Sequence, residues 1–306
     1  MRVFRESHLS LPDRRQGKVR ESYRLPGGQR LFVTTDRLSA FDRVLGCVPY
    51  KGQVLNELAA WWFRHLENTH LVSVPDPNAL VAREATPLPV EIVMRGYITG
   101  VTGTSLWHRY SLGEREIYGH RLPDGLKKNQ ALPTPLMTPT TKGGPSGHDE
   151  RLTCEEAAAL VGDAWDTAAG MAREIFADGQ KLALSRGLLL VDSKYEFGVT
   201  EDGQVLLIDE VHTPDSSRFW EGSTYAELQA DGYEPDSLDK EFVRLAYAER
   251  GYRGEGEPPE VPEGLWSAAS RLYIEVFERL TGHKFVPGLY PVEERLVLNL
   301  EREGWL

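Results

Sequence analysis

The chain is poor in cysteine. Among its 306 residues, only Cys47 and Cys154 carry a thiol. Two thiols cannot supply a disulfide framework or a cysteine zinc cluster. Reduced cysteines are the ordinary state in cytosolic proteins. We therefore expect a cytoplasmic protein that holds its fold without disulfides.

Long apolar segments are also missing. The N-terminal residues, MRVFRESHLSLPDRRQGK, lack the apolar stretch of roughly 7–15 residues that a signal peptide needs. No apolar run approaches the roughly 18 residues of a membrane span. These two absences predict a protein that is neither secreted nor inserted in a membrane.

Basic residues are outnumbered by acidic ones. Lys and Arg total 35 against 46 Asp and Glu, which gives a net charge of −11. General nucleic-acid binding needs a basic face, so we expect no nucleic-acid partner. Hydrophobic residues at 41% and charged residues at 26% are typical of a globular protein with a core. A few local basic residues can still bind anions.

The order of patterns predicts an α+β protein. Hairpin and strand patterns come first, over residues 17–36 and 90–98, and residues 52–67 have helical periodicity. Residues 133–150 read as a long Pro/Gly/Thr-rich loop, which is usually functional in a compact protein. Helical patterns dominate afterwards, over 153–179 behind a Thr153 capping box, and over 237–250, 264–281 and 291–303. We place a domain boundary near residue 110, giving parts 1–110 and 111–306.

Residues 188–210, LLLVDSKYEFGVTEDGQVLLIDE, predict a hairpin that carries charges inside apolar strands. Period-2 alternation puts Asp192, Lys194 and Glu196 on one face. If Asp202-Gly203 forms a two-residue type I′ turn, Glu196 lies opposite Asp209, with Cβ atoms about 5 Å apart. A Mg²⁺ ion between the two carboxylates would make that pair tolerable. The alternative is a solvated edge hairpin with an incidental ion pair, and a register shift of one residue would turn Asp209 to the other face.

Several separate basic segments could bind phosphate. Gly17-Lys18-Val19-Arg20 lies on a hairpin and is not a P-loop, which would need GxxxxGK[ST] before a helix. Arg95 precedes a stretch of glycines and hydroxyls, and Arg218 follows two serines, so both suit a phosphate monoester. Ordinary turns with exposed basic side chains are the alternative for each. Together with the carboxylate pair, these segments predict Mg²⁺-ATP and a second, phosphorylated ligand.

Seven motifs in one order resemble the SAICAR synthetase family. They are GKVRESY (17–23), TTDRLSAFD (34–42), YKGQVLNELAAWW (50–62), PVEIVMRGYITG (89–100), GTSLW (103–107), LLLVDSKYEFG (188–198) and IDEVHTPDSSRFW (208–220). The resemblance covers nearly the whole chain, with an insertion in the RGYITGVTGTSLW segment and additional C-terminal helices. It implies an antiparallel N-terminal ATP-binding part, a larger mixed part, and a nucleotide site in the cleft between them.

The resemblance also implies an activity. Such an enzyme joins the carboxylate of carboxyaminoimidazole ribotide (CAIR) to the amine of L-aspartate, with ATP and Mg²⁺, in purine biosynthesis. A carboxylate is a poor electrophile, so phosphorylation to an acyl phosphate would supply the leaving group. The partners expected are therefore these small molecules, and the oligomeric state is left open, a monomer included.

Residue roles carry over motif by motif. The resemblance implies that Thr102 and Thr104 are alternatives to Ser105, because of the local insertion. The residues expected to act on the reacting groups are Lys194, Asp192 and Lys142. Those expected to contact ATP are Gly17, Lys18, Val19, Arg20, Lys142, Glu196 and Asp209, of which Glu196 and Asp209 would bind the metal. Those expected to contact CAIR or aspartate are Ser39, Asp42, Arg95, Ser105, Asp149, Asp192, Asp215, Ser217 and Arg218.

Two other functions use the same residues differently. A small-molecule kinase on a related scaffold would keep the metal pair and release a stable phosphorylated product. A non-catalytic regulator that binds purine nucleotides would not need the row of Asp192, Lys194 and Glu196.

Overall fold

The computed structural model describes residues 2–143, 149–262 and 264–306, and these form two compact units. Unit 1 comprises Met1–Glu84, His212–Asp215 and Leu238–Leu306. Unit 2 comprises Ala85–Val211 and Ser216–Ser237. The boundary expected near residue 110 falls inside unit 2, and the C-terminal helices belong to unit 1. The physical reason is that the chain passes between the units several times, which a single cut in the sequence cannot represent.

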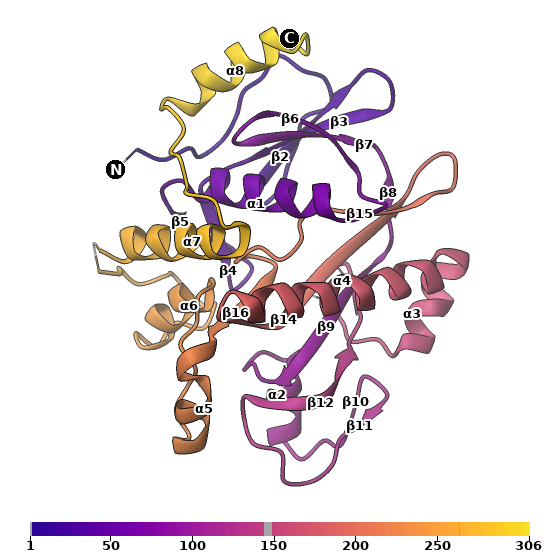
Figure 1. Cartoon of the computed structure of the whole chain (residues 1–306), viewed down its shortest axis with the longest axis vertical. Helices are drawn as coiled ribbons and strands as arrows, with labels where there is room; N and C mark the ends of the chain where they lie inside the picture. Colours follow the sequence, from indigo (N-terminus) through magenta and orange to yellow (C-terminus); the bar gives the residue numbers. More distant parts are fainter. Residues whose placement is uncertain (1, 144–148, 263) are drawn as a thin grey trace. The chain divides into compact units, whose positions relative to one another are not determined.

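Unit 1 is built on an antiparallel sheet of strand order β1-β2-β3-β7-β6, with a separate β4-β5 hairpin. Helix α1 packs on this sheet, α7 packs on α1, and α8 lies beside β6 (Figure 1). Its strands are β1 (Arg15–Gln16), β2 (Arg20–Leu25), β3 (Gln29–Thr34), β4 (Arg37–Ala40), β5 (Arg43–Cys47), β6 (Leu71–Asp76) and β7 (Ala79–Arg83). Its helices are α1 (Lys51–His65), α6 (Glu241–Ala248), α7 (Leu265–Thr281) and α8 (Val292–Arg302).

Unit 2 is built on a second antiparallel sheet, of order β12-β9-β14-β15, in which β16 and β8 also pair with β14. Helix α4 lies along β14 (Figure 1). The strands are β8 (Thr86–Pro87), β9 (Val90–Ile98), β10 (Glu116–Ile117), β11 (His120–Arg121), β12 (Gln130–Met137), β13 (Thr140–Thr141), β14 (Leu188–Val199), β15 (Val205–Ile208) and β16 (Ser217–Glu221). The helices are α2 (Leu106–Ser111), α3 (Cys154–Val161), α4 (Trp165–Ser185) and α5 (Gly222–Asp231).

Local patterns predicted many of these elements. Strand β9 has the predicted bounds, and α1 and α7 differ from theirs by at most two residues at either end. The capping box at Thr153 is present, because its side chain accepts from Glu156 N–H and Glu156 bonds back to Thr153 N–H. Within the described part of the chain, no helix combines the length and apolar character needed to cross a bilayer. The α+β class is confirmed.

Two sequence-based predictions of local structure were wrong. The helix expected over 153–179 is interrupted at Gly162, where φ is +75°, and α4 then continues past Gly179 to Ser185. Gly179 is buried on the face of α4, so it serves packing rather than termination. The loop expected over 133–150 contains most of β12 and all of β13, while residues 144–148 lie outside the described residues.

Candidate active site

The centre of the candidate site in unit 2 is Asp192 on β14, which lies between two arginines on neighbouring strands. Its Cα pairs with Arg95 on β9 and with Arg218 on β16. A bulge falls between Leu190 and Asp192 in the β14–β16 pairing. Bulges redirect side chains and are frequent beside active sites. Asp192 Oδ2 accepts from Arg95 NH1 at 3.3 Å and from Arg218 NH1 at 2.8 Å.

Arg95 is held on every side of its guanidinium. Its Nε donates to Thr138 Oγ1 at 2.8 Å, and its NH2 donates to the Thr104 carbonyl at 3.3 Å. The residue is only 6% exposed. A buried cation fixed in this way can present charge to an anion without first losing side-chain freedom.

Ser105 and Arg218, both predicted to contact the phosphorylated substrate, lie near each other. A Cβ added to Gly100 would be 3.1 Å from Ser105 Oγ and 3.3 Å from Arg218 NH1. Both side chains therefore pack closely on Gly100, where a Cβ would also lie only 2.5 Å from Ser105 Cβ. Ser105 Oγ donates to the Thr102 carbonyl at 2.7 Å, which fixes the position of this hydroxyl.

Further along the same face of β14, Lys194 Nζ lies among carboxylates. It is 3.0 Å from Glu91 Oε1 and 3.7 Å from Asp209 Oδ2, and it also pairs with Glu196. Lys142 pairs with the other carboxylate oxygen of Glu196. The predicted ATP and metal residues Lys142, Glu196 and Asp209 thus meet around Lys194.

The predicted opposition of Glu196 and Asp209 was wrong in register. Glu196 pairs with Ile208, and the strands are joined by a longer turn in which Thr200 N–H bonds to the Gln204 carbonyl. Asp209 follows the end of β15 with φ +67°. Asp209 lies beyond the β14–β15 pairing, so strand alternation no longer determines which face its side chain occupies. The carboxylate of Asp209 therefore reaches Lys194 despite the shift.

The charges in this cluster stabilise one another. Burial alone would disfavour the charged form of Lys194, but the carboxylates of Glu196, Asp209 and Glu91 raise its pKa well above the usual value. Burial likewise opposes the charged form of Glu196, but Lys194 and Lys142 hold its pKa well below the usual range. The cluster is thus an ammonium–carboxylate network at neutral pH.

The predicted ATP segment lies in unit 1, at the turn between β1 and β2. Gly17 N–H donates to the Arg20 carbonyl at 2.8 Å, which closes the turn. Lys18 Nζ is 2.6 Å from Asp42 Oδ1, and both side chains are exposed. Ser39 lies on β4, whose two-residue turn to β5 has positive φ at Phe41 and Asp42. Lys18 lies on the turn, before β2 begins at Arg20.

Three other residues predicted to contact CAIR or aspartate bond to protein groups. Asp215 lies in unit 1, where its carboxylate is 2.7 Å from Lys51 Nζ and accepts from Tyr273 OH at 2.6 Å. Ser217 points to the face of β16 opposite Arg218, where its Oγ donates to Ser193 Oγ at 2.8 Å. Asp149 accepts from Gly143 N–H at 3.1 Å in unit 2.

Sequence reasoning missed Glu91, the third carboxylate at Lys194. Its pKa is raised, first by burial, which the Lys194 charge opposes. A signal was available, since Glu91 and Arg95 are four residues apart on a predicted strand and so share a face. Thr138, which orients Arg95, gave no such signal, because it lies in the segment interpreted as a loop.

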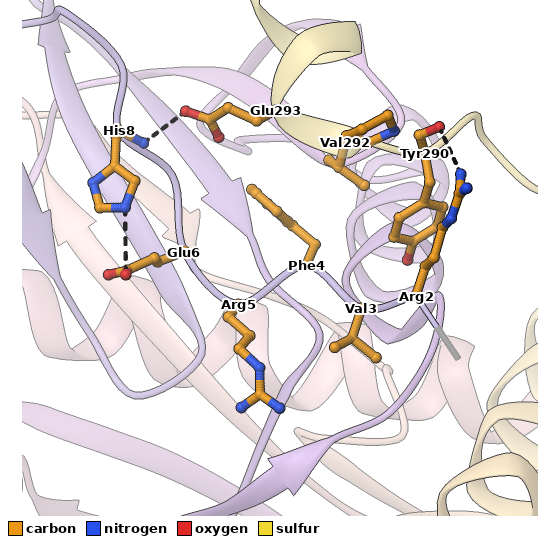
Figure 2. Close-up of a pocket in the computed structure, with 10 residues that line it drawn as sticks. Arg2, Val3, Phe4, Arg5, Glu6, His8, Tyr290, Val292 and Glu293 are labelled. Atoms are coloured by element: carbon orange, nitrogen blue, oxygen red, sulfur yellow. Dashed lines mark hydrogen bonds and ion pairs between the residues drawn. The ribbon is translucent and has the colours of Figure 1, made fainter.

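Each unit contains a hollow. One in unit 2, of about 690 Å³, is lined by Thr104, Tyr118, Asp149 and neighbouring residues. The other, in unit 1, has about 440 Å³ and lies between residues 2–8 and the start of α8 (Figure 2). The second hollow contains no residue predicted to bind a ligand.

The model of the family described as SAICAR synthetase matches residues 13–259. The chain belongs to the SAICAR synthetase family. The predicted resemblance is thereby confirmed over most of the sequence.

Relatives named as phosphoribosylaminoimidazole-succinocarboxamide synthases align with nearly the full length of this chain. A putative phosphoribosylaminoimidazole-succinocarboxamide synthase 2 of Agrobacterium fabrum is 48% identical, over 94% of this chain and 93% of its own. The phosphoribosylaminoimidazole-succinocarboxamide synthase of Legionella pneumophila (strain Paris) is 44% identical, over 98% of both chains. A SAICAR synthase from Saccharomyces cerevisiae, solved in complex with SAICAR, superposes with TM-score 0.78 at 32% identity, over 93% of this chain and all of that one.

Proposed function

We propose that this SAICAR synthetase family member is an ATP-dependent ligase that joins CAIR to L-aspartate, giving SAICAR, ADP and phosphate in purine biosynthesis. The observation that carries the proposal is the row along β14. Asp192 holds two arginines that can bind a phosphorylated ligand, and Lys194 and Glu196 follow on the same face. Family membership and the named relatives support the ligase rather than the kinase alternative.

The chemistry requires charge neutralisation and positioning. ATP phosphorylates the CAIR carboxylate, and the aspartate amine then attacks the acyl phosphate and expels inorganic phosphate. We assign Gly17–Arg20 and Lys142 to the nucleotide, and Arg95, Ser105 and Arg218 to the ribotide phosphate. Lysines close to the transferring phosphoryl group stabilise the charge that develops there. Lys142 and Lys194 therefore act as electrostatic groups rather than as nucleophiles.

The donor set fits a Mg²⁺ ion bound jointly with a nucleotide. Glu196 and Asp209 converge on the one Lys194 ammonium, and two carboxylates with phosphate oxygens are a common Mg²⁺ environment. Among the residues that the structure describes, no cluster of three or more acidic, histidine or cysteine side chains could hold a metal. The two carboxylates would thus depend on nucleotide oxygens. The ion would neutralise charge on the phosphates when bound.

The reaction is tested by measuring ADP release with ATP, CAIR, L-aspartate and Mg²⁺, and then with each omitted. ADP and an amide product are expected only in the complete mixture. A stable phosphorylated product formed without aspartate would favour the kinase. ATP binding without any turnover would favour the regulator.

Glu196→Gln is expected to lower turnover about 100-fold, the order of loss when one preorganised electrostatic group of an active site is removed. It removes the charge that orients both Lys142 and Lys194. The measurement is kcat with the apparent Mg²⁺-ATP affinity. Glu201→Gln, on the exposed turn of the same hairpin, is the matched control. Wild-type turnover in the Glu196 variant would refute its assignment.

A further inference from the structure

Arg37, at the start of β4, is buried against the turn that we assign to ATP. Its Nε donates to the Lys18 carbonyl at 2.9 Å, and its NH2 donates to the Gly17 carbonyl at 3.1 Å. Its NH1 contacts Glu21 Oε1 at 2.9 Å and the Arg5 carbonyl at 2.6 Å. One side chain thus binds two successive carbonyls of the turn and the carboxylate of the strand that follows it.

Thr35 binds the next carbonyl along. Its backbone N–H and its Oγ1 both donate to the Val19 carbonyl, at 3.0 and 2.7 Å. The carbonyls of Gly17, Lys18 and Val19 are therefore all held by the segment 35–37. This segment belongs to the motif TTDRLSAFD, whose Thr35 and Arg37 the proposed reaction does not otherwise use.

These contacts determine where the amides of the turn can point. In a trans peptide the N–H points opposite to the preceding carbonyl. Across the described chain, the N–H groups of Lys18 and Val19 form no hydrogen bond, and Lys18 is exposed. Successive unpaired amides are a typical anion-binding element. Fixing the carbonyls inward thus leaves adjacent donors facing outward.

We propose that Arg37 is a positioning residue for ATP, which holds the carbonyls of Gly17 and Lys18 so that the amides of Lys18 and Val19 face the nucleotide phosphates. This inference rests on the proposed function, because it takes the 17–20 turn as part of the ATP site. Arginine suits the role because its planar fork spreads donors over several acceptors, whereas a lysine ammonium offers one point charge. A purely structural Arg37 would serve only to neutralise Glu21, whose side chain is fully buried.

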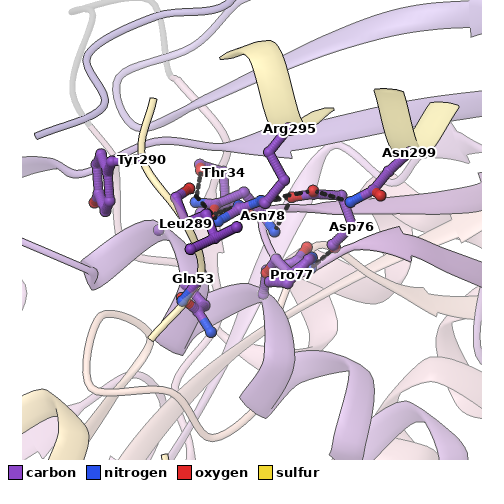
Figure 3. Close-up of polar contacts among 12 residues, drawn as sticks. Thr34, Gln53, Asp76, Pro77, Asn78, Leu289, Tyr290, Arg295 and Asn299 are labelled. Atoms are coloured by element: carbon purple, nitrogen blue, oxygen red, sulfur yellow. Dashed lines mark hydrogen bonds and ion pairs between the residues drawn. The ribbon is translucent and has the colours of Figure 1, made fainter. Parts of the chain in front are cut away.

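The first experiment compares Arg37→Lys with Arg295→Lys. Arg295 is a matched control in unit 1, because it is also largely buried and binds a carboxylate, Asp76, through Nε and NH2 at 2.9 Å each (Figure 3). It also donates to a backbone carbonyl, that of Leu289, but not to the 17–20 turn. Isothermal titration gives the Kd for Mg²⁺-ATP and for CAIR, and hydrogen exchange at the bonded amide of Gly17 reports on the turn.

We expect Arg37→Lys to raise the Kd for ATP about tenfold, equivalent to about 1.4 kcal/mol. Exchange at Gly17, whose N–H is hydrogen-bonded to the Arg20 carbonyl, should accelerate in the same variant, and CAIR affinity should stay unchanged. Arg295→Lys should leave all three readouts as in the wild type, even if both variants lose stability. Equal ATP affinity in the two variants would overturn the positioning role.

A double variant separates positioning from charge neutralisation. Arg37→Gln with Glu21→Gln removes both charges of the buried pair, so neither is left uncompensated. If Arg37 only neutralises Glu21, the double variant binds ATP normally and the inference is overturned. If Arg37 positions the turn, ATP binding stays weak.

Lys18→Ala distinguishes an error in the role of Arg37 from an error in assigning the 17–20 turn to ATP. Weaker ATP binding in Lys18→Ala, with normal binding in both Arg37 variants, would leave the assignment intact and refute the role of Arg37. Normal ATP binding in Lys18→Ala and the Arg37 variants would refute both, because the turn would then not contact the nucleotide.

Discussion

Replacing Asp192 with alanine is expected to lower the free energy of unfolding by about 3–5 kcal/mol, the usual result of breaking a buried ion pair on one side. Asp192 Oδ2 is shared by Arg95 and Arg218, whose side chains are only 8% and 17% exposed. Without the carboxylate, two guanidinium groups lie close together with no charge between them. The loss should be seen as a lower midpoint in urea unfolding.

An anion should reverse part of this loss. If the two guanidiniums form the ribotide phosphate site, inorganic phosphate binds between them and stabilises the folded state by mass action. The stability gap between wild type and Asp192→Ala should therefore narrow in phosphate but not in chloride of equal ionic strength. The double variant Asp192→Ala with Arg218→Met provides the control, since removing one arginine should recover stability in chloride and abolish the effect of phosphate. A gap that is independent of phosphate would contradict the site.

Local elements of this fold could be predicted because their patterns need no partner. The 3.6-residue stripe of α1 and the apolar run of β9 each fit one structure. Strand β12 could not be predicted in this way, because Pro133 and Pro135 interrupt it and prolines are tolerated only on an edge strand or at a bulge. Its edge position in the sheet is set by tertiary pairing with β9. Strand β16 was missed for the same reason. Its Ser- and Pro-containing flank does not indicate a strand, and it becomes one through pairing with β14.

In the site, too, some residues could be placed from local pattern and others only from tertiary pairing. Period-2 alternation was sufficient to place Lys194 and Glu196 on one face, and their ion pair confirms it. The position of Asp209 depended on the turn, and a longer turn with a left-handed Asp209 brought it to Lys194 by another route. Glu91 lies 103 residues from Lys194 in sequence, so only the pairing of β9 with β14 brings the two together.

Stability is expected to fall steeply below pH 6.5, and His70 is one identifiable cause. Burial, aided by the charge of Arg20, lowers the pKa of His70 to about 3 from the ordinary 6.5. The ring lies against Phe32 and Phe63, and its Nε2 has no hydrogen-bond partner in the structure as described. The folded protein thus keeps His70 neutral where the unfolded chain protonates it.

Between pH 6.5 and 3 the unfolded state binds one more proton at His70, so stability decreases as pH falls. The contribution is complete above pH 6.5, and each unit below it removes about 1.4 kcal/mol per such histidine. His212, which is also buried with its pKa lowered to about 3 by burial, should add a similar slope.

The measurement is the free energy of unfolding in urea at intervals from pH 7 to pH 4.5. In His70→Gln the unfolding free energy should depend less steeply on pH, by about the contribution of one proton, because glutamine cannot titrate. This change in slope is expected whatever the absolute stability of the variant. Phe63→Leu is the matched control: it lies 5.0 Å from the His70 ring between centroids and should lower the whole curve without altering its slope. An unchanged slope in His70→Gln would mean that His70 is protonated in the folded protein as readily as in the unfolded chain. That would require a partner that stabilises the charged ring, and the two phenylalanines packed against it cannot do so.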